Sequence, residues 1–352
     1  MRTVPTIQMR NLKGLATGIG SLPHKDIEAA LDLIFKYTPH IPFWPQLPKR
    51  DIREGMIVQF SENFPCLKVT HDGLFFDGNY QEKALETFYE RIINNDVDYF
   101  RISPDFALGL HKFYQRLERF GLKEAEFIKC HITGPFTFAA SIKDEKGAVL
   151  LHNAVFMQAI LKGLSMKALW QIKLFEKFGK KIIFFIDEPY LGSYGSAYTP
   201  INKEDVVRGL TEVVDGIKST DVLVGVHCCG NTDWSILTQA KGIDIISFDA
   251  FGFLDKVMLY ANNLKEFMDR GGILCWGIVP TLEFTDKETI DSLIGRIKDG
   301  INVLTKKGVD EDLLLDNLLI SPSCGLGTLD TKKSEKIFKL LSEVSLSIRK
   351  TP

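Results

Sequence analysis

The stretch KIIFFID, residues 181–187, is apolar without interruption from Ile182 to Ile186 and then ends on an acidic residue. A strand with one face in solvent alternates polar and apolar residues, whereas a strand buried on both faces is apolar throughout. This stretch therefore predicts a parallel strand inside an α/β protein. Seven further runs of the same character predict strands at residues 15–21, 56–60, 127–132, 222–227, 243–248, 273–279 and 317–321.

Amphipathic segments separate most of these runs. Apolar residues recur at three- and four-residue spacing in residues 25–37, 202–218 and 286–308, and the last segment ends on a glycine. Eight strands alternating with helices predict a single (β/α)8 TIM barrel over residues 1–352. The connection between the second and third strands, roughly residues 61–126, is oversized. Within it CLKVTHDGLFFD predicts a β-hairpin on an Asp-Gly turn, and we expect an insertion rather than a separate domain.

The composition is typical of a globular enzyme. The 352 residues are 45% hydrophobic and 25% charged with a formal net charge of -2, so no nucleic-acid partner is expected. No apolar run reaches the length of a membrane span, and the N-terminus lacks the apolar core of a signal peptide. Six cysteines, two of them adjacent, are too few for a disulfide framework. We expect a cytoplasmic protein with reduced thiols and no membrane partner.

Polar residues stand where the predicted strands end. Ser21 ends the first strand, Asp187 the fourth and His227 the fifth, whereas Asp249 follows the sixth and Cys324 the eighth. In barrel enzymes the carboxyl ends of the strands carry the active site. These five residues are therefore candidates for a functional site.

The stretch VGVHCCGN, residues 224–231, contains a histidine followed by two cysteines. Because side chains alternate along a strand, His227 and Cys229 face one side, and the cysteine between them faces the other. Cys324 in the loop SPSCGLGT offers a second thiol, and Asp249 lies at the same rim. One imidazole, two thiolates and one oxygen form a borderline-soft set that favours Zn²⁺. The alternative is a buried strand whose cysteines pack as small hydrophobic residues.

The predicted ligand set favours a particular chemistry. Zinc held by two thiolates is a poor Lewis acid for water, but it suits an incoming thiol, which it keeps as a nucleophilic thiolate near neutral pH. The reaction class that follows is methyl or alkyl transfer to a thiol. A carboxylate at a strand end, such as Asp187, suits a substrate with a cationic group.

Five stretches resemble the catalytic C-terminal barrel of cobalamin-independent methionine synthase, in the superfamily that also contains uroporphyrinogen decarboxylase. In family order they are GIGSLPH (18–24), HITGPFTF (131–138), FIDEPYL (185–191), HCCGN (227–231) with ISFDA (246–250), and SPSCGLGT (321–328). The resemblance implies zinc ligands at His227, Cys229 and Cys324, with Asp249 where the family has a glutamate ligand.

The same resemblance implies how homocysteine, or another small thiol, is held. Ser21, next to Gly20, would bind the substrate carboxylate, and Asp187 would bind the ammonium group. We expect Ser21 and Asp187 to act in catalysis, and Glu188 and Glu54 to be further substrate contacts.

Two departures from the family concern the methyl donor. The chain leaves no room for the duplicated N-terminal barrel, and Ile278 in CWGIVPT replaces the histidine that activates the folate leaving group. A methyl-corrinoid donor needs no such proton. The chain thus resembles the short core methionine synthases, which implies a methylated corrinoid protein or free methylcobalamin as donor.

The resulting hypothesis is a zinc-dependent methyltransferase that converts homocysteine to methionine. Three alternatives stay open. They are a zinc methyltransferase for another thiol such as coenzyme M, a decarboxylase of the uroporphyrinogen type, and a non-catalytic zinc- or corrinoid-handling module.

Overall fold

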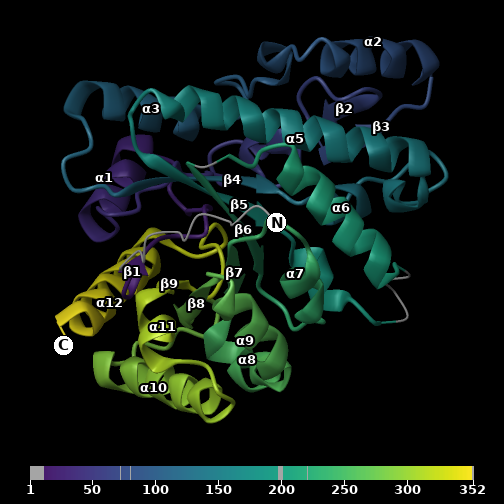
Figure 1. Ribbon diagram of the computed structural model, residues 1–352. Helices are drawn as coiled ribbons and strands as arrows, with labels where there is room; N and C mark the ends of the chain where they lie inside the picture. Colours follow the sequence, from purple (N-terminus) through teal and green to yellow (C-terminus); the bar gives the residue numbers. More distant parts are fainter. Residues whose placement is uncertain (1–11, 72, 80, 197–200, 220, 351–352) are drawn as a thin grey trace.

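The computed structural model describes residues 12–71, 73–79, 81–196, 201–219 and 221–350. A curled parallel sheet runs through the centre with helices around it (Figure 1), and its seven strands follow the order β1-β9-β8-β7-β6-β5-β4. The strands are β1 (Leu15–Ala16), β4 (Phe127–Thr133), β5 (Lys181–Asp187), β6 (Val222–Cys228), β7 (Ile245–Phe248), β8 (Ile273–Val279) and β9 (Leu318–Pro322). The expected α/β class with parallel strands is confirmed.

Helices surround this sheet (Figure 1). They are α1 (Ile27–Tyr37), α2 (Gln81–Ile93), α3 (Leu108–Phe120), α4 (Pro135–Ala140), α5 (Ala154–Glu176), α6 (Lys203–Asp215), α7 (Ser235–Gln239), α8 (Ala250–Val257), α9 (Ala261–Asp269), α10 (Ile290–Lys306), α11 (Glu311–Asp316) and α12 (Thr331–Lys350). The three amphipathic segments predicted from the sequence form α1, α6 and α10. No helix in the described ranges is long and apolar enough to cross a membrane.

The inner face of the sheet carries its own apolar layer, separate from the core beneath the helices. Alternate residues near the strand starts supply this layer, which includes Leu15, Ile41, Phe127, Ile183, Leu223, Ile245, Ile273 and Leu319. A barrel-like interior filled by side chains is a packed core rather than a pore. This layer therefore closes the amino end of the sheet, and polar chemistry is confined to the carboxyl end.

The predicted second strand, residues 56–60, is wrong. Val58–Phe60 form a 3₁₀ helix, in which the Phe60 N–H donates to the Ile57 carbonyl at 3.3 Å. Residues 58–60 are buried, but a short apolar run does not distinguish a strand from a buried helical turn. The sheet accordingly has seven strands, and the expected closed barrel of eight strands is not observed among the described residues.

Residues 40–47, HIPFWPQL, lie between the two edge strands of the sheet. Gln46 forms a parallel bridge with Ser21 beyond β1, and Phe43 forms one with Lys129 of β4. The prolines of this segment have no N–H to donate, so it makes isolated bridges instead of a continuous ladder. An extended segment, rather than an eighth strand, thereby connects the sheet edges.

The predicted hairpin is confirmed. β2 (Leu67–Thr70) pairs antiparallel with β3 (Gly73–Phe76), and Asp72 of the predicted turn lies outside the described residues. The Phe76 ring packs edge-on against Phe156 of α5, with 4.6 Å between ring centroids. The hairpin and α2 therefore lie on the outer side of α5 (Figure 1).

Candidate functional site

A cavity of about 690 Å³ opens at the carboxyl ends of the strands. Its lining includes Ser21 beyond β1, Asp187 at the end of β5, His227 and Cys229 at the end of β6, and Cys324 beyond β9. The curl of the sheet brings these residues from distant parts of the chain to one rim, where the sequence predicts the site.

Three of the four predicted metal ligands meet in this cavity. One ligand atom each from His227, Cys229 and Cys324 lies within 4.8 Å of the others. Within the ranges that the structure describes, this is the one such group of three or more His, Cys, Asp or Glu residues. Cys228, between the first two, is fully buried in the core. This arrangement follows from the alternation of side chains along β6.

The imidazole of His227 is oriented toward the two thiols. Its Nδ1 lies 2.9 Å from Ser247 Oγ, whereas its buried Nε2 has no hydrogen-bond partner. When Nδ1 donates its proton to Ser247, Nε2 presents a lone pair. A buried polar atom without a partner is costly, and a metal ion would satisfy it. A hydrogen bond from the other ring nitrogen is the usual way in which a metal-binding histidine is fixed.

The two thiols influence each other's ionisation. The hydrogen bond with Cys324 lowers the pKa of Cys229, and the same contact, together with burial, raises the pKa of Cys324. A pair of neighbouring thiolates needs a cation beside it to lose both protons. One imidazole nitrogen and two thiolate sulfurs fit Zn²⁺, and three protein ligands leave the fourth tetrahedral position for a substrate.

Asp249 is not grouped with these three residues. Its Oδ1 accepts the Gly252 N–H at 2.7 Å, which makes it the N-cap of α8. Burial raises the pKa of this carboxyl group. The structure therefore gives Asp249 a capping role, and its function as a zinc ligand stays a prediction.

Asp187 faces the cavity with an available acceptor. The residue is 8% exposed, and its Oδ1 has no hydrogen-bond partner. Burial raises the pKa of Asp187, and the positive charge of Lys129 on β4 opposes this shift. Lys129 is itself fully buried, which lowers its pKa to about 8, and its Nζ donates to the Ile19 carbonyl at 2.6 Å. The Asp187 carboxylate is thus free to accept from a cationic substrate group.

Glu188, predicted as a substrate contact, is absent from the cavity lining. Its carboxylate accepts the backbone N–H groups of Phe136 and Thr137, each at 2.9 Å, and the Thr137 hydroxyl at 2.6 Å. A Cβ at Gly134 would overlap this carboxyl group, so glycine is required there. Burial raises the pKa of Glu188 to about 7. The residue anchors the first turn of α4.

We expect Glu188→Ala to lower the free energy of unfolding by about 3 kcal/mol, because the substitution leaves three buried donors without an acceptor. Urea denaturation followed by circular dichroism measures the change. The matched control is Glu335→Ala, which removes a surface carboxylate and should cost less than about 1 kcal/mol. A Glu188→Ala cost as small as that of the control would contradict the anchoring role.

Glu54 also lies outside the lining. It is fully buried, forms an ion pair with Arg50 at 2.8 Å and accepts the Leu108 N–H at 2.7 Å. These contacts connect the 3₁₀ turn Ile52–Glu54 to the start of α3. The structure therefore gives Glu54 a structural contact, and its role as a substrate contact stays a prediction.

The two neighbouring N-terminal candidates, Ser21 and Gly20, have different surroundings. Ser21 lines the cavity, and its Oγ accepts the Gly327 N–H at 3.3 Å. Gly20 is not part of the lining; a Cβ there would lie 2.9 Å from the ring of His131, and its carbonyl accepts the Gln46 N–H at 3.1 Å. Gly20 therefore allows close packing behind the site rather than contact with a substrate.

The cavity has lining residues that the sequence did not single out. They include Lys49, Met56, Thr281 and Leu282. Thr281 is the last residue of the stretch CWGIVPT, and Met56 is the first residue of the misassigned second strand. In the sequence, Lys49 could have been noticed only as one of two basic residues in the stretch LPKR, which follows the proline-rich segment. Ile278, where the family has a histidine, is fully buried in the core.

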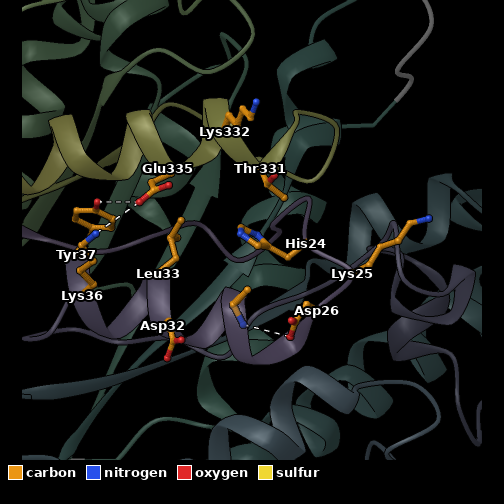
Figure 2. A pocket seen from close by; sticks show the side chains of 11 residues that line it. His24, Lys25, Asp26, Asp32, Leu33, Lys36, Tyr37, Thr331, Lys332 and Glu335 are labelled. Carbon is orange, nitrogen blue, oxygen red and sulfur yellow. Dashed lines mark hydrogen bonds and ion pairs between the residues drawn. The ribbon is translucent and has the colours of Figure 1, made fainter.

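A second cavity of about 470 Å³ lies between α1 and the start of α12 (Figure 2). Its carboxylates have partners: Asp26 caps α1 by accepting the Glu28 N–H, and Glu335 pairs with Lys36 at 3.6 Å. Neither the thiols nor Asp187 line it. This cavity is separate from the predicted site.

The fold and the first cavity define an α/β protein with a thiol–imidazole cluster at the carboxyl ends of parallel strands. No family model matches the chain. The chain is 27% identical to a methionine synthase of Methanocaldococcus jannaschii over 206 residues, which are 57% of this chain and 59% of that protein. The chain is therefore methionine synthase-like in sequence.

Two solved structures are more distant. A B12-independent methionine synthase from Shewanella sp. W3-18-1, in complex with selenomethionine, is 18% identical with a TM-score of 0.45, over 68% of this chain and 66% of that chain. A GH138 enzyme targeting pectin rhamnogalacturonan II is 10% identical with a TM-score of 0.30, over 71% of this chain and 36% of that chain. The matches thus span less than two thirds of the relatives' own length.

Proposed function

We propose that this chain is a zinc-dependent methyltransferase that methylates the thiol of homocysteine to give methionine. The observation that carries the proposal is the convergence of His227, Cys229 and Cys324 within 4.8 Å, with the His227 Nε2 buried and without a partner. The likeness to methionine synthase supports the choice of reaction. Such a donor set suits thiol activation better than water activation.

Zinc bound by these three residues would lower the pKa of an incoming thiol, so that the thiol reacts as a thiolate near pH 7. The chain's own residues orient the substrate. Asp187 accepts from the substrate ammonium through its free Oδ1, and the Ser21 hydroxyl donates to the carboxylate. The substrate sulfur then attacks the methyl carbon in line, and the bond between methyl and donor breaks with its electron pair remaining on the donor.

The proposed methyl donor is a methylated corrinoid, bound to a partner protein or free. A folate leaving group requires a proton, whereas a corrinoid leaving group does not. Among the described residues that line the cavity, His227 is the only histidine, and it belongs to the thiol cluster. Ile278 is buried in the core instead of facing the cavity. These placements support a donor that leaves without protonation.

The alternative of another thiol as acceptor is tested together with the main proposal. A sulfonate substrate such as coenzyme M would place its negative charge in the cavity that contains the Asp187 carboxylate. An amino-acid substrate instead brings an ammonium group to it. Homocysteine is therefore the acceptor that the charges favour.

Zinc X-ray absorption on the purified protein tests the proposal. We expect about two sulfur ligands without substrate and about three with L-homocysteine, because the substrate sulfur fills the open position. L-homoserine, with oxygen in place of sulfur, is the matched control and should leave the sulfur number unchanged. A zinc site that does not respond to L-homocysteine would contradict the proposed acceptor, and protein without zinc would contradict the metal.

A further inference from the structure

The charges of the cavity lining suggest how it selects its substrate. Apart from the His227 imidazole, the described lining contains one cationic side chain, Lys49, and one carboxylate, Asp187. We propose that Lys49 is a specificity-determining residue that binds the carboxylate of the thiol substrate, so that the cavity selects an amino-acid thiol over an aminothiol without a carboxylate. This inference rests on the proposed function and adds a residue that the family resemblance does not supply.

The position of Lys49 follows from the segment that connects the sheet edges. Residues 40–47 run along β1, where the Leu22 N–H donates to the Gln46 carbonyl at 2.9 Å, and the chain then reaches Lys49 at the rim. Lys49 is exposed on one side and lines the cavity on the other. A cation at this point lies at the exposed rim of the cavity.

The Lys49 ammonium is held over the loop that carries Cys324. Its Nζ donates to the Leu329 carbonyl, next to Thr328 of the lining. The same loop donates the Gly327 N–H to Ser21 Oγ at 3.3 Å. The ammonium and the Ser21 hydroxyl are therefore fixed to one loop, and together they form a subsite of hydrogen-bond donors.

This subsite retains unused donors. A lysine ammonium has three N–H bonds, and the Leu329 carbonyl takes one of them. The Ser21 Oγ accepts from Gly327, which leaves its own O–H able to donate. A carboxylate accepts several such bonds and forms stronger, charge-assisted ones than a neutral acceptor does, whereas a cationic group is repelled by the ammonium. The subsite therefore fits an anionic substrate group.

Charge balance in the cavity points to the same role. Asp187 places negative charge in the lining and would repel the carboxylate of an amino acid, whereas bound zinc would balance the charge of the two thiolates. Lys49 is the lining residue that opposes this repulsion, while Asp187 attracts the ammonium group on the same substrate carbon. A lysine also has a flexible four-carbon stem, which allows its ammonium to follow the bound substrate.

The test compares two thiols that differ only in the carboxylate. L-homocysteine and 3-aminopropane-1-thiol are titrated calorimetrically into the zinc-loaded protein and its variants. We expect Lys49→Met to weaken L-homocysteine binding about tenfold, as for the loss of a charge-assisted hydrogen bond, and to leave binding of 3-aminopropane-1-thiol unchanged. Lys49→Arg should retain most of the affinity. Lys332→Met, an exposed lysine at the second cavity (Figure 2), is the matched control and should change neither.

Each other outcome overturns the inference in a distinguishable way. Equal losses for both thiols would show that Lys49 only tethers the Cys324 loop, and unchanged L-homocysteine binding would show that it does not contact the carboxylate. In both cases the wild-type protein binds the thiol and the proposed function stands. Failure of the wild-type protein to bind either thiol would overturn the proposed function together with the inference.

Discussion

Replacement of Cys324 by serine is expected to remove most of the proposed zinc and, with it, the proposed methyltransferase activity. A serine hydroxyl stays protonated at neutral pH and is a far weaker zinc ligand than a thiolate. Loss of a residue that only hydrogen-bonds to a metal ligand typically weakens metal binding by about 10–100-fold. Loss of a ligand itself should therefore raise the zinc dissociation constant at least about 100-fold. Zinc per chain after gel filtration, and competition with a chelator of known affinity, measure the effect.

The matched control for this substitution is Cys228→Ala. Cys228 is the neighbour of Cys229 in sequence, but it is fully buried in the core, where its Sγ contacts the Gly230 carbonyl at 3.5 Å. This variant should keep a full complement of zinc while losing some stability. Full zinc occupancy in Cys324→Ser would remove Cys324 from the ligand set, and zinc loss in Cys228→Ala would show that the assignment by strand alternation is wrong.

Asp187→Asn should raise the KM for L-homocysteine about 10–100-fold and leave the zinc content unchanged. Asparagine has the same shape but no charge, so the substitution removes a charge-assisted hydrogen bond to the substrate ammonium. The Oδ1 of Asp187 has no partner in the protein, so the loss should fall on substrate binding and not on a structural contact. Steady-state kinetics over a range of L-homocysteine concentrations measures the KM.

Two further measurements make this prediction specific. Thermal unfolding of Asp187→Asn should differ little from that of the wild-type protein, because removal of a buried carboxylate is offset by the loss of its attraction to the buried Lys129 ammonium. Asp249→Asn, at the same rim, serves as control; it keeps the side-chain oxygen that caps α8 and should leave both the stability and the KM nearly unchanged. An unchanged KM in Asp187→Asn would refute the assignment of Asp187 to the ammonium group.

The fold could be predicted in part from local pattern. β5 and β6 follow from continuous apolar runs, and α10 follows from its periodicity and its stop at Gly308, where φ is +87°. The run at 56–60 has the same apolar character and forms a 3₁₀ turn instead. Residues 40–47 were missed because prolines in an extended segment are typical of a loop. Only the packed neighbours on both sides reveal that this segment connects the sheet edges.

The candidate site could likewise be predicted only in part. The sequence by itself determined that His227 and Cys229 face the same side of their strand, because alternation is a property of the local backbone. Their proximity to Cys324, which is 95 positions beyond Cys229, is visible only in the folded structure, because the curl of the sheet brings the two strand ends together.

Which acidic side chains face the cavity also becomes clear only in the folded structure. Asp187 and Glu188 are neighbours of the same type, yet Asp187 faces the cavity with a free acceptor, while Glu188 faces α4 and is fully hydrogen-bonded. Lys49 lines the cavity because residues 40–47, which precede it, run along the edge of the sheet. The direction of a side chain follows from the sequence within one element, whereas its partners depend on which other elements pack against it.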